Sequence, residues 1–80
     1  MPISAVRLDA TAIDASVTDD RLIVVLADGR ELSAPLAWFP RLVEASEGQR
    51  RNWRLIGGGH GIHWPDVDED ISVASLLRAG

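Results

Sequence analysis

Alternation of apolar and polar residues marks three extended segments in the first half of the chain. Residues 13–18 (IDASVT) alternate with a period of two, which is typical of a strand with its apolar side chains buried on one face. Residues 21–27 are apolar on both faces, which favours a strand in the centre of a sheet. Residues 30–36 alternate again, with leucine and alanine on the core side. We therefore predict an antiparallel meander of about three strands.

Asp28-Gly29 lies between the second and third of these segments. This pair is a strong hairpin signal, because a type I′ turn requires positive φ at both central residues. We therefore expect a type I′ turn at this position.

The hydrophobic period changes to that of a helix after Leu36. Pro40 suits the first turn of a helix over residues 40–45, with Phe39, Leu42 and Val43 as a stripe that faces the sheet. Residues 46–49 (SEGQ) have the spacing of a capping box, which predicts a second helical turn to about residue 53.

The last third of the chain predicts a further pair of short β-arms and a final helix. Strand propensity returns at residues 54–56 and 62–64, on either side of a glycine-rich break. Residues 66–70 (DVDED) are expected to be an acidic connector, and Ser72 is expected to cap a helix that begins at Val73. The fold predicted for residues 1–80 is a single α+β domain: the meander, the β-arm pair, and two or three short helices.

Length, charge and cysteine content limit the function. Eighty residues allow one hydrophobic core, and the absence of cysteine excludes a disulfide framework and a thiolate metal site. A net charge of −4 opposes contact with phosphate backbones, so no direct nucleic-acid binding is expected. No apolar run is long enough to span a membrane, and the N-terminus does not resemble a secretory signal. We expect a cytoplasmic protein.

The glycine-rich break suggests one possible binding site. Gly57, Gly58, Gly59 and His60 form a loop whose backbone amides could approach an anion, but the spacing of phosphate-binding loops is absent. A wide turn with positive φ explains the same residues. His60 and His63 lie near acidic residues, yet their side chains point to opposite faces of an extended chain, so no metal site and no cofactor are expected.

The serines lack an activating histidine partner and the G-x-S-x-G elbow, so an enzyme is not expected. The acidic segment lacks the glycine and the glutamate of a calcium loop. It is expected to cap the last helix, to keep the connector solvated, to meet an arginine-rich partner, or to pair with the arginines at positions 50, 51 and 54.

The four aromatic residues are expected mainly in the core, where each removes a large area from water. One partly exposed tryptophan, either Trp38 or Trp64, would serve as an interface anchor.

The segments PLAWFPRL (35–42), QRRNW (49–53) and GIHWPDVDEDISV (61–73) resemble the bacterial domain of unknown function 2442. The resemblance runs through nearly the whole chain. It implies a small α+β domain without an established activity or catalytic residue. Some relatives carry a helix-turn-helix domain, and some are encoded beside a companion in proposed toxin–antitoxin pairs.

The leading hypothesis is a protein-interaction module that binds a partner or itself, with an antitoxin-like role as one form of it. The residues expected to bind are Trp38, Arg41, Trp64, Asp66, Asp68, Glu69 and Asp70. One alternative is a small-ligand or anion-binding domain that uses the Gly57–Gly61 loop. A further alternative is a regulatory domain that acts with a DNA-binding partner.

Overall fold

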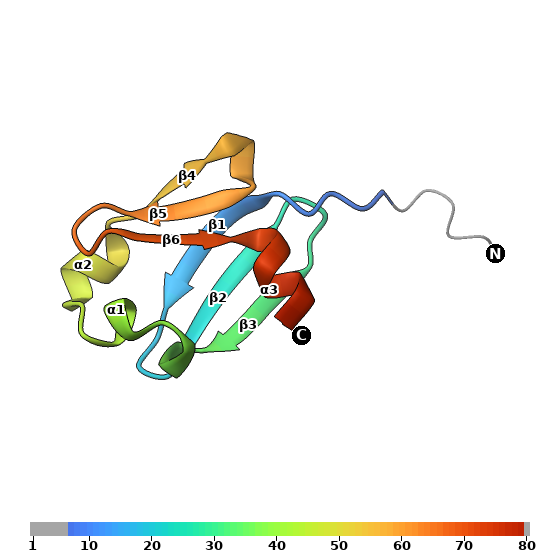
Figure 1. Ribbon diagram of the computed structural model, residues 1–80. Helices are drawn as coiled ribbons and strands as arrows, with labels where there is room; N and C mark the ends of the chain where they lie inside the picture. The colour runs from blue at the N-terminus through green and yellow to red at the C-terminus, as the bar shows by residue number, and fades with distance from the viewer. Residues whose placement is uncertain (1–6, 80) are drawn as a thin grey trace.

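Two three-stranded antiparallel sheets and three short α-helices form the part of the chain that the computed structural model describes, residues 7–79 (Figure 1). This arrangement confirms the predicted α+β class. The elements in chain order are β1 (Ala12–Val17), β2 (Arg21–Leu26), β3 (Glu31–Pro35), the 3₁₀ turn η1 (Leu36–Trp38), α1 (Pro40–Val43), α2 (Glu47–Arg51), β4 (Arg54–Ile56), the 3₁₀ turn η2 (Gly57–Gly59), β5 (Gly61–Trp64), β6 (Glu69–Ser72) and α3 (Val73–Ala79).

The first sheet has the strand order β1-β2-β3, so the prediction that residues 21–27 form a central strand is confirmed. Leu22, Val24 and Leu26 of β2 point into the core and are almost completely buried. The side chains between them on β2 are only partly buried, because the opposite face of the sheet is nearer to solvent.

The alternation predicted for the first strand fails at Ile13. Ala12 pairs with Leu26 and Asp14 with Val25, so β1 has one extra residue at this point. This bulge turns Ala12 into the core and leaves Ile13 57% exposed.

The turn at Asp28-Gly29 is also different from the prediction. The Gly29 amide donates to the Leu26 carbonyl at 3.0 Å, and the Leu26 amide donates to the Arg30 carbonyl at 2.8 Å. Gly29 has a φ of 94°, whereas Asp28 has no positive φ. The loop is therefore a type I turn followed by a left-handed glycine, and the type I′ prediction is wrong. Asp28 is held in this turn because its carboxylate accepts the Arg30 amide at 3.1 Å.

The second sheet has the order β4-β5-β6 and packs over the first. Strands β4 and β5 are the predicted β-arm pair. Residues 66–68 of the predicted acidic connector do form a turn, but Glu69 and Asp70 begin a third strand, β6, which pairs with β5 from Gly61↔Ser72 to Trp64↔Glu69. Ile62, Trp64 and Ile71 of this sheet are buried against β2, and they form the core between the sheets.

The helices begin where the sequence indicates. Pro40 occupies the first turn of α1, and Ser46 and Gln49 form both halves of the predicted capping box at α2. The Ser72 hydroxyl accepts the Ser75 amide at 3.1 Å, as expected of an N-cap. Leu42 is fully buried, but Val43 is exposed, because consecutive side chains on a helix point about 100° apart and α1 turns Leu42 to the core. Within residues 7–79, no helix is both long and apolar enough to cross a membrane.

Candidate functional site

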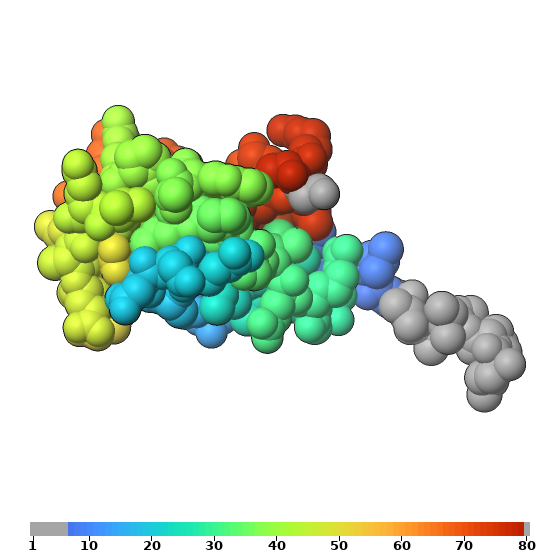
Figure 2. Space-filling model, turned by 90° about the horizontal axis from the view of Figure 1, so that it is seen from below, coloured from blue at the N-terminus to red at the C-terminus, as the bar shows by residue number. Residues whose placement is uncertain are grey.

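A groove of about 390 Å³ lies between η1, β6 and α3. In Figure 2, the chain around η1 (green) and α3 (red) lies on the same face of the molecule. The groove combines apolar walls with two carboxylates and two hydroxyls. Its lining residues are Trp38, Phe39, Glu69, Asp70, Ile71, Ser72, Ser75, Leu76 and Ala79.

Trp38 reaches the groove because the chain turns sharply after β3. Leu36 at the start of η1 is buried, and its carbonyl accepts the Phe39 amide at 2.8 Å. This turn directs Phe39 partly into the core and leaves the Trp38 ring 53% exposed. An exposed aromatic ring beside an apolar groove is a typical anchor of a binding surface.

The opposite wall of the groove is the free edge of β6. In an antiparallel pair, alternate residues exchange both backbone hydrogen bonds with the partner strand. The Val73 amide donates to the His60 carbonyl at 3.0 Å, so the backbone amides and carbonyls of residues 69, 71 and 73 are the ones that face β5. The backbone groups of Asp70 and Ser72 therefore point away from the sheet. In agreement, the Asp70 amide donates to Oε1 of Glu69 at 3.1 Å instead of to β5.

Asp70 contributes a largely exposed carboxylate to the rim of the groove. Its side chain is 65% exposed, and its Oδ1 lies 2.5 Å from Nδ1 of His63 on the neighbouring strand. At the N-terminal end of β6, Nη1 of Arg41 donates to the carbonyl of Asp68. This contact ties α1 to the second sheet and marks one end of the free edge.

The structure brings five of the seven residues predicted to bind to this one place. Trp38, Glu69 and Asp70 line the groove, and Arg41 lies at its end. Asp68 takes part through its backbone carbonyl and has a φ of 52°, as the last residue of the turn before β6.

Trp64 does not belong to the surface. Its side chain is fully buried on β5, and its indole Nε1–H donates to the Arg50 carbonyl at 3.0 Å. Alternation along β5 points Trp64 into the core. The hypothesis that Trp64 is a surface anchor is therefore wrong.

The acidic segment does not pair with the arginines near α2. Asp66 accepts a hydrogen bond from Nδ2 of Asn52 at 3.0 Å, away from the groove lining. Arg50 donates to the carbonyls of Leu42 and Val43, where it satisfies the C-terminal end of α1. Glu69 and Asp70 therefore do not pair with the arginines near α2.

The glycine loop is a tight turn that packs against the rest of the molecule. Gly57, Gly58 and Gly59 all have positive φ, as predicted, but the turn is a tight 3₁₀ turn in which the His60 amide donates to the Gly57 carbonyl at 3.3 Å, and the predicted wide turn is wrong. Gly59 is buried, and a Cβ there would come within 2.8 Å of the Ala12 carbonyl oxygen. Contact with β1 explains this glycine without a ligand.

No group of three or more His, Asp or Glu side chains in residues 7–79 has an arrangement that could hold a metal ion. His60 precedes β5, whereas His63 lies within it, where its Nδ1 is 2.5 Å from Oδ1 of Asp70.

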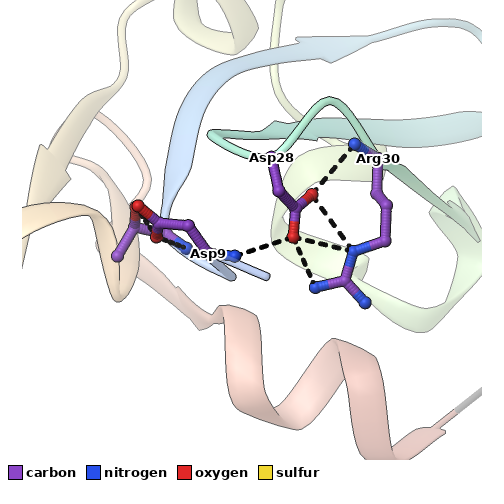
Figure 3. A network of polar contacts seen from close by, with 4 residues as sticks. Asp9, Asp28 and Arg30 are labelled. Carbon is purple, nitrogen blue, oxygen red and sulfur yellow. Dashed lines mark hydrogen bonds and ion pairs between the residues drawn. The ribbon is translucent and has the colours of Figure 1, made fainter. Parts of the chain in front are cut away.

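A separate polar cluster holds the segment before β1 against the β2–β3 turn (Figure 3). The Asp28 carboxylate accepts the Asp9 amide at 2.9 Å and pairs with Nη2 of Arg30 at 2.9 Å. The Arg30 hydrogen bonds lower the pKa of Asp28 from 3.8 to about 2. The hydroxyl and amide of Thr11 likewise lower the pKa of Asp9. Every oxygen of Asp28 is occupied by donors, and its side chain is only 3% exposed, so this cluster is structural.

The α3 side of the groove was not predicted from the sequence. Ser72, Ser75, Leu76 and Ala79 line the groove with the spacing of one helix face. That spacing is visible in the sequence. Leu76, however, also fits a hydrophobic staple with Ile71 at the start of the helix, so the spacing alone does not indicate a groove.

Comparison with known proteins gives a family without an assigned activity. The family model "Protein of unknown function (DUF2442)" matches residues 12–80. A protein of unknown function from Rhodospirillum rubrum ATCC 11170 has a similar crystal structure, with 30% sequence identity and a TM-score of 0.73. The similarity covers 86% of this chain and 86% of that chain. No curated protein matches the sequence.

Proposed function

This chain belongs to the DUF2442 family of proteins of unknown function, and from the geometry of the groove we propose that it is a protein-binding module. The observation that carries the proposal is the position of Trp38. Its ring is half-exposed beside the apolar side of a groove whose other side bears carboxylates. Tryptophan is enriched among residues that dominate binding energy, because one ring buries a large area with little loss of conformational freedom.

The groove suits a segment of a partner more than a whole protein face. Its volume of about 390 Å³ is enough for a few side chains. Phe39, Leu76 and Ala79, together with Trp38, give the groove an apolar lining for one anchor residue. We infer that the partner inserts an apolar side chain at this point.

The negative charge at the rim of the groove favours a basic residue next to the apolar anchor in the partner. Glu69 and Asp70 both line the groove, from consecutive positions of β6, and the chain as a whole carries a charge of −4. An arginine or lysine in the partner would meet complementary charge, which increases the rate of association more than the final affinity.

The antitoxin-like role and the regulatory role with a DNA-binding partner are two specific forms of this proposal. In both, the groove would hold a segment of the partner, which would be a toxin in one case and a DNA-binding protein in the other. The family resemblance motivates these roles, and the identity of the captured segment would separate them.

The test is a selection of peptides followed by a comparison of variants. Twelve-residue peptides from a random display library are selected on the immobilised protein, synthesised, and titrated against it by fluorescence anisotropy. Trp38→Ala is expected to weaken binding about 30-fold, as the loss of an anchor residue does. Ile13→Ala is the matched control, because Ile13 is similarly exposed but lies on β1, outside the groove.

Selected peptides should contain an apolar residue next to arginine or lysine. The proposal fails if no peptide is enriched, or if Trp38→Ala and Ile13→Ala bind the selected peptides equally well. Circular dichroism of both variants would verify that they remain folded.

A further inference from the structure

We propose that the partner segment binds in an extended conformation and adds as a strand to the free edge of β6. This inference rests on the proposed function and specifies how the groove is filled. The second sheet would then grow from three strands to four, with the added strand between β6 and Trp38.

The backbone of β6 provides the first argument. β6 is the outer strand in the order β4-β5-β6, and its pairing with β5 uses residues 69, 71 and 73. The amide and carbonyl of Asp70 and the amide of Ser72 therefore point into the groove that both residues line. An edge with free backbone groups is the template on which peptides add as strands.

One backbone donor of this edge is already bonded to a side chain of the protein. Oε1 of Glu69 accepts the Asp70 amide at 3.1 Å, so an entering strand must displace that carboxylate. A satisfied amide of this kind reduces uncontrolled pairing between sheet edges. Once displaced, the Glu69 carboxylate becomes available to a basic side chain of the incoming segment.

The ends of the edge limit the length of the added strand. Arg41 already occupies the Asp68 carbonyl, and α3 begins directly after Ser72. Only the stretch from Glu69 to Ser72 remains, so the paired part of the partner spans about four residues.

The two faces of the edge differ in chemistry, and this difference selects the sequence of the partner. Ile71 points into the core, while Asp70 points to the outer face beside His63. Side chains of an added strand alternate in the same way. Those on the inner side would meet Trp38 and Leu76, and those on the outer side would meet Asp70. The favoured pattern is alternating apolar and basic residues.

Charge argues against a second copy of this chain as the occupant. Antiparallel pairing of β6 with β6 would bring Glu69 and Asp70 of both copies close together. Like charges on neighbouring strands are destabilising. A basic extended segment avoids this repulsion.

The test uses one of the selected twelve-residue peptides in two measurements on the full chain. Each peptide amide is methylated in turn, which removes one backbone donor at a time. Strand addition predicts that methylation of one peptide amide, the donor to the Asp70 carbonyl, weakens binding by about tenfold, and that methylation of the amides on either side of it has little effect. Hydrogen exchange provides the second measurement: binding should slow exchange of the Ser72 amide, while the Ile71 amide, which already faces β5, should change little.

Each outcome separates this inference from the proposed function. Binding that depends on Trp38 but shows no single peptide amide sensitive to methylation and no protection of the Ser72 amide would overturn strand addition and leave the groove as the binding site. Binding that does not depend on Trp38 would contradict both the groove as the binding site and strand addition at β6. Sedimentation of the unliganded protein tests the second copy: a dimer that the peptide dissociates would show that the edge pairs with itself, contrary to the inference.

Discussion

Two regions of this small domain hold carboxylates in opposite ways. At the β2–β3 turn, Asp28 is surrounded by the donors of Arg30 and the Asp9 amide, and its side chain is almost inaccessible. At the groove, Asp70 contacts one histidine and remains 65% exposed. The first carboxylate has all its partners within the molecule. The second has room for a partner from outside.

The contrast shows how a structural charge differs from one that is available for binding. An acidic residue alone identifies no site, because the same side chain either closes a turn or lines a groove. The number of donors already engaged, together with exposure, makes the distinction. On this basis we place function at the groove and stability at the Asp28 cluster.

The largest expected effect concerns the packing of Gly59 against Thr11 and Ala12 at the start of β1. Gly59→Val should destabilise the fold by about 3 kcal/mol or more, because the new side chain would meet the Ala12 carbonyl at a residue with positive φ. Gly58→Val is the control: it has a similar φ but open space around it, so about 1–2 kcal/mol is expected. Urea unfolding measures both. Equal losses would mean that contact with β1 contributes little.

An intermediate effect is expected from acid. Because the pKa of Asp28 is lowered to about 2, its ionised form stabilises the fold above pH 3.8, and this contribution disappears as the pH falls towards 2. Asp28→Asn should therefore have a lower thermal midpoint than the wild type at pH 5, and the difference should narrow between pH 4 and pH 2.

Arg30→Gln provides a control for the cause of this shift, because Arg30 supplies the main hydrogen bonds that lower the pKa of Asp28. The difference in thermal midpoint between Arg30→Gln and the wild type should likewise narrow between pH 4 and pH 2. A difference between Asp28→Asn and the wild type that stays constant down to pH 2 would contradict the account of this cluster.

The smallest effect on stability is expected at the groove. Glu69→Gln with Asp70→Asn should change the free energy of unfolding by less than about 0.5 kcal/mol, since exposed charges contribute little. Association with a selected basic peptide should nevertheless slow, and its dependence on salt should weaken. Glu31→Gln, on the exposed side of β3, is the control and should leave the association rate unchanged. A large loss of stability in the double variant would show that these carboxylates are structural.

Local signals in the sequence were sufficient for most of the fold. The capping box at Ser46, the proline at the start of α1 and the period-two segments correspond to real elements. These features depend on interactions over a few residues, which the sequence displays directly.

The features that could not be predicted depend on contacts between distant segments. The bulge that exposes Ile13 is a matter of register between two strands, and β6 forms from acidic residues with low strand propensity because β5 lies beside it. Tertiary packing also decides which tryptophan is buried. Trp38 and Trp64 have similar local sequences, each with a proline close behind it. Only the packing of the two sheets buries Trp64 and leaves Trp38 exposed.

The most direct test of the central claim is a map of where a peptide binds. A selected basic peptide is titrated into ¹⁵N-labelled protein, and the amide and indole signals are followed by NMR. We predict that the shifts concentrate on the Trp38 indole and on residues 69–72 and 75–79, with little change at Asp28 or at Gly57–Gly59. Shifts centred on the glycine loop or on the Asp28 cluster, with the groove unaffected, would contradict the assignment of function to the groove.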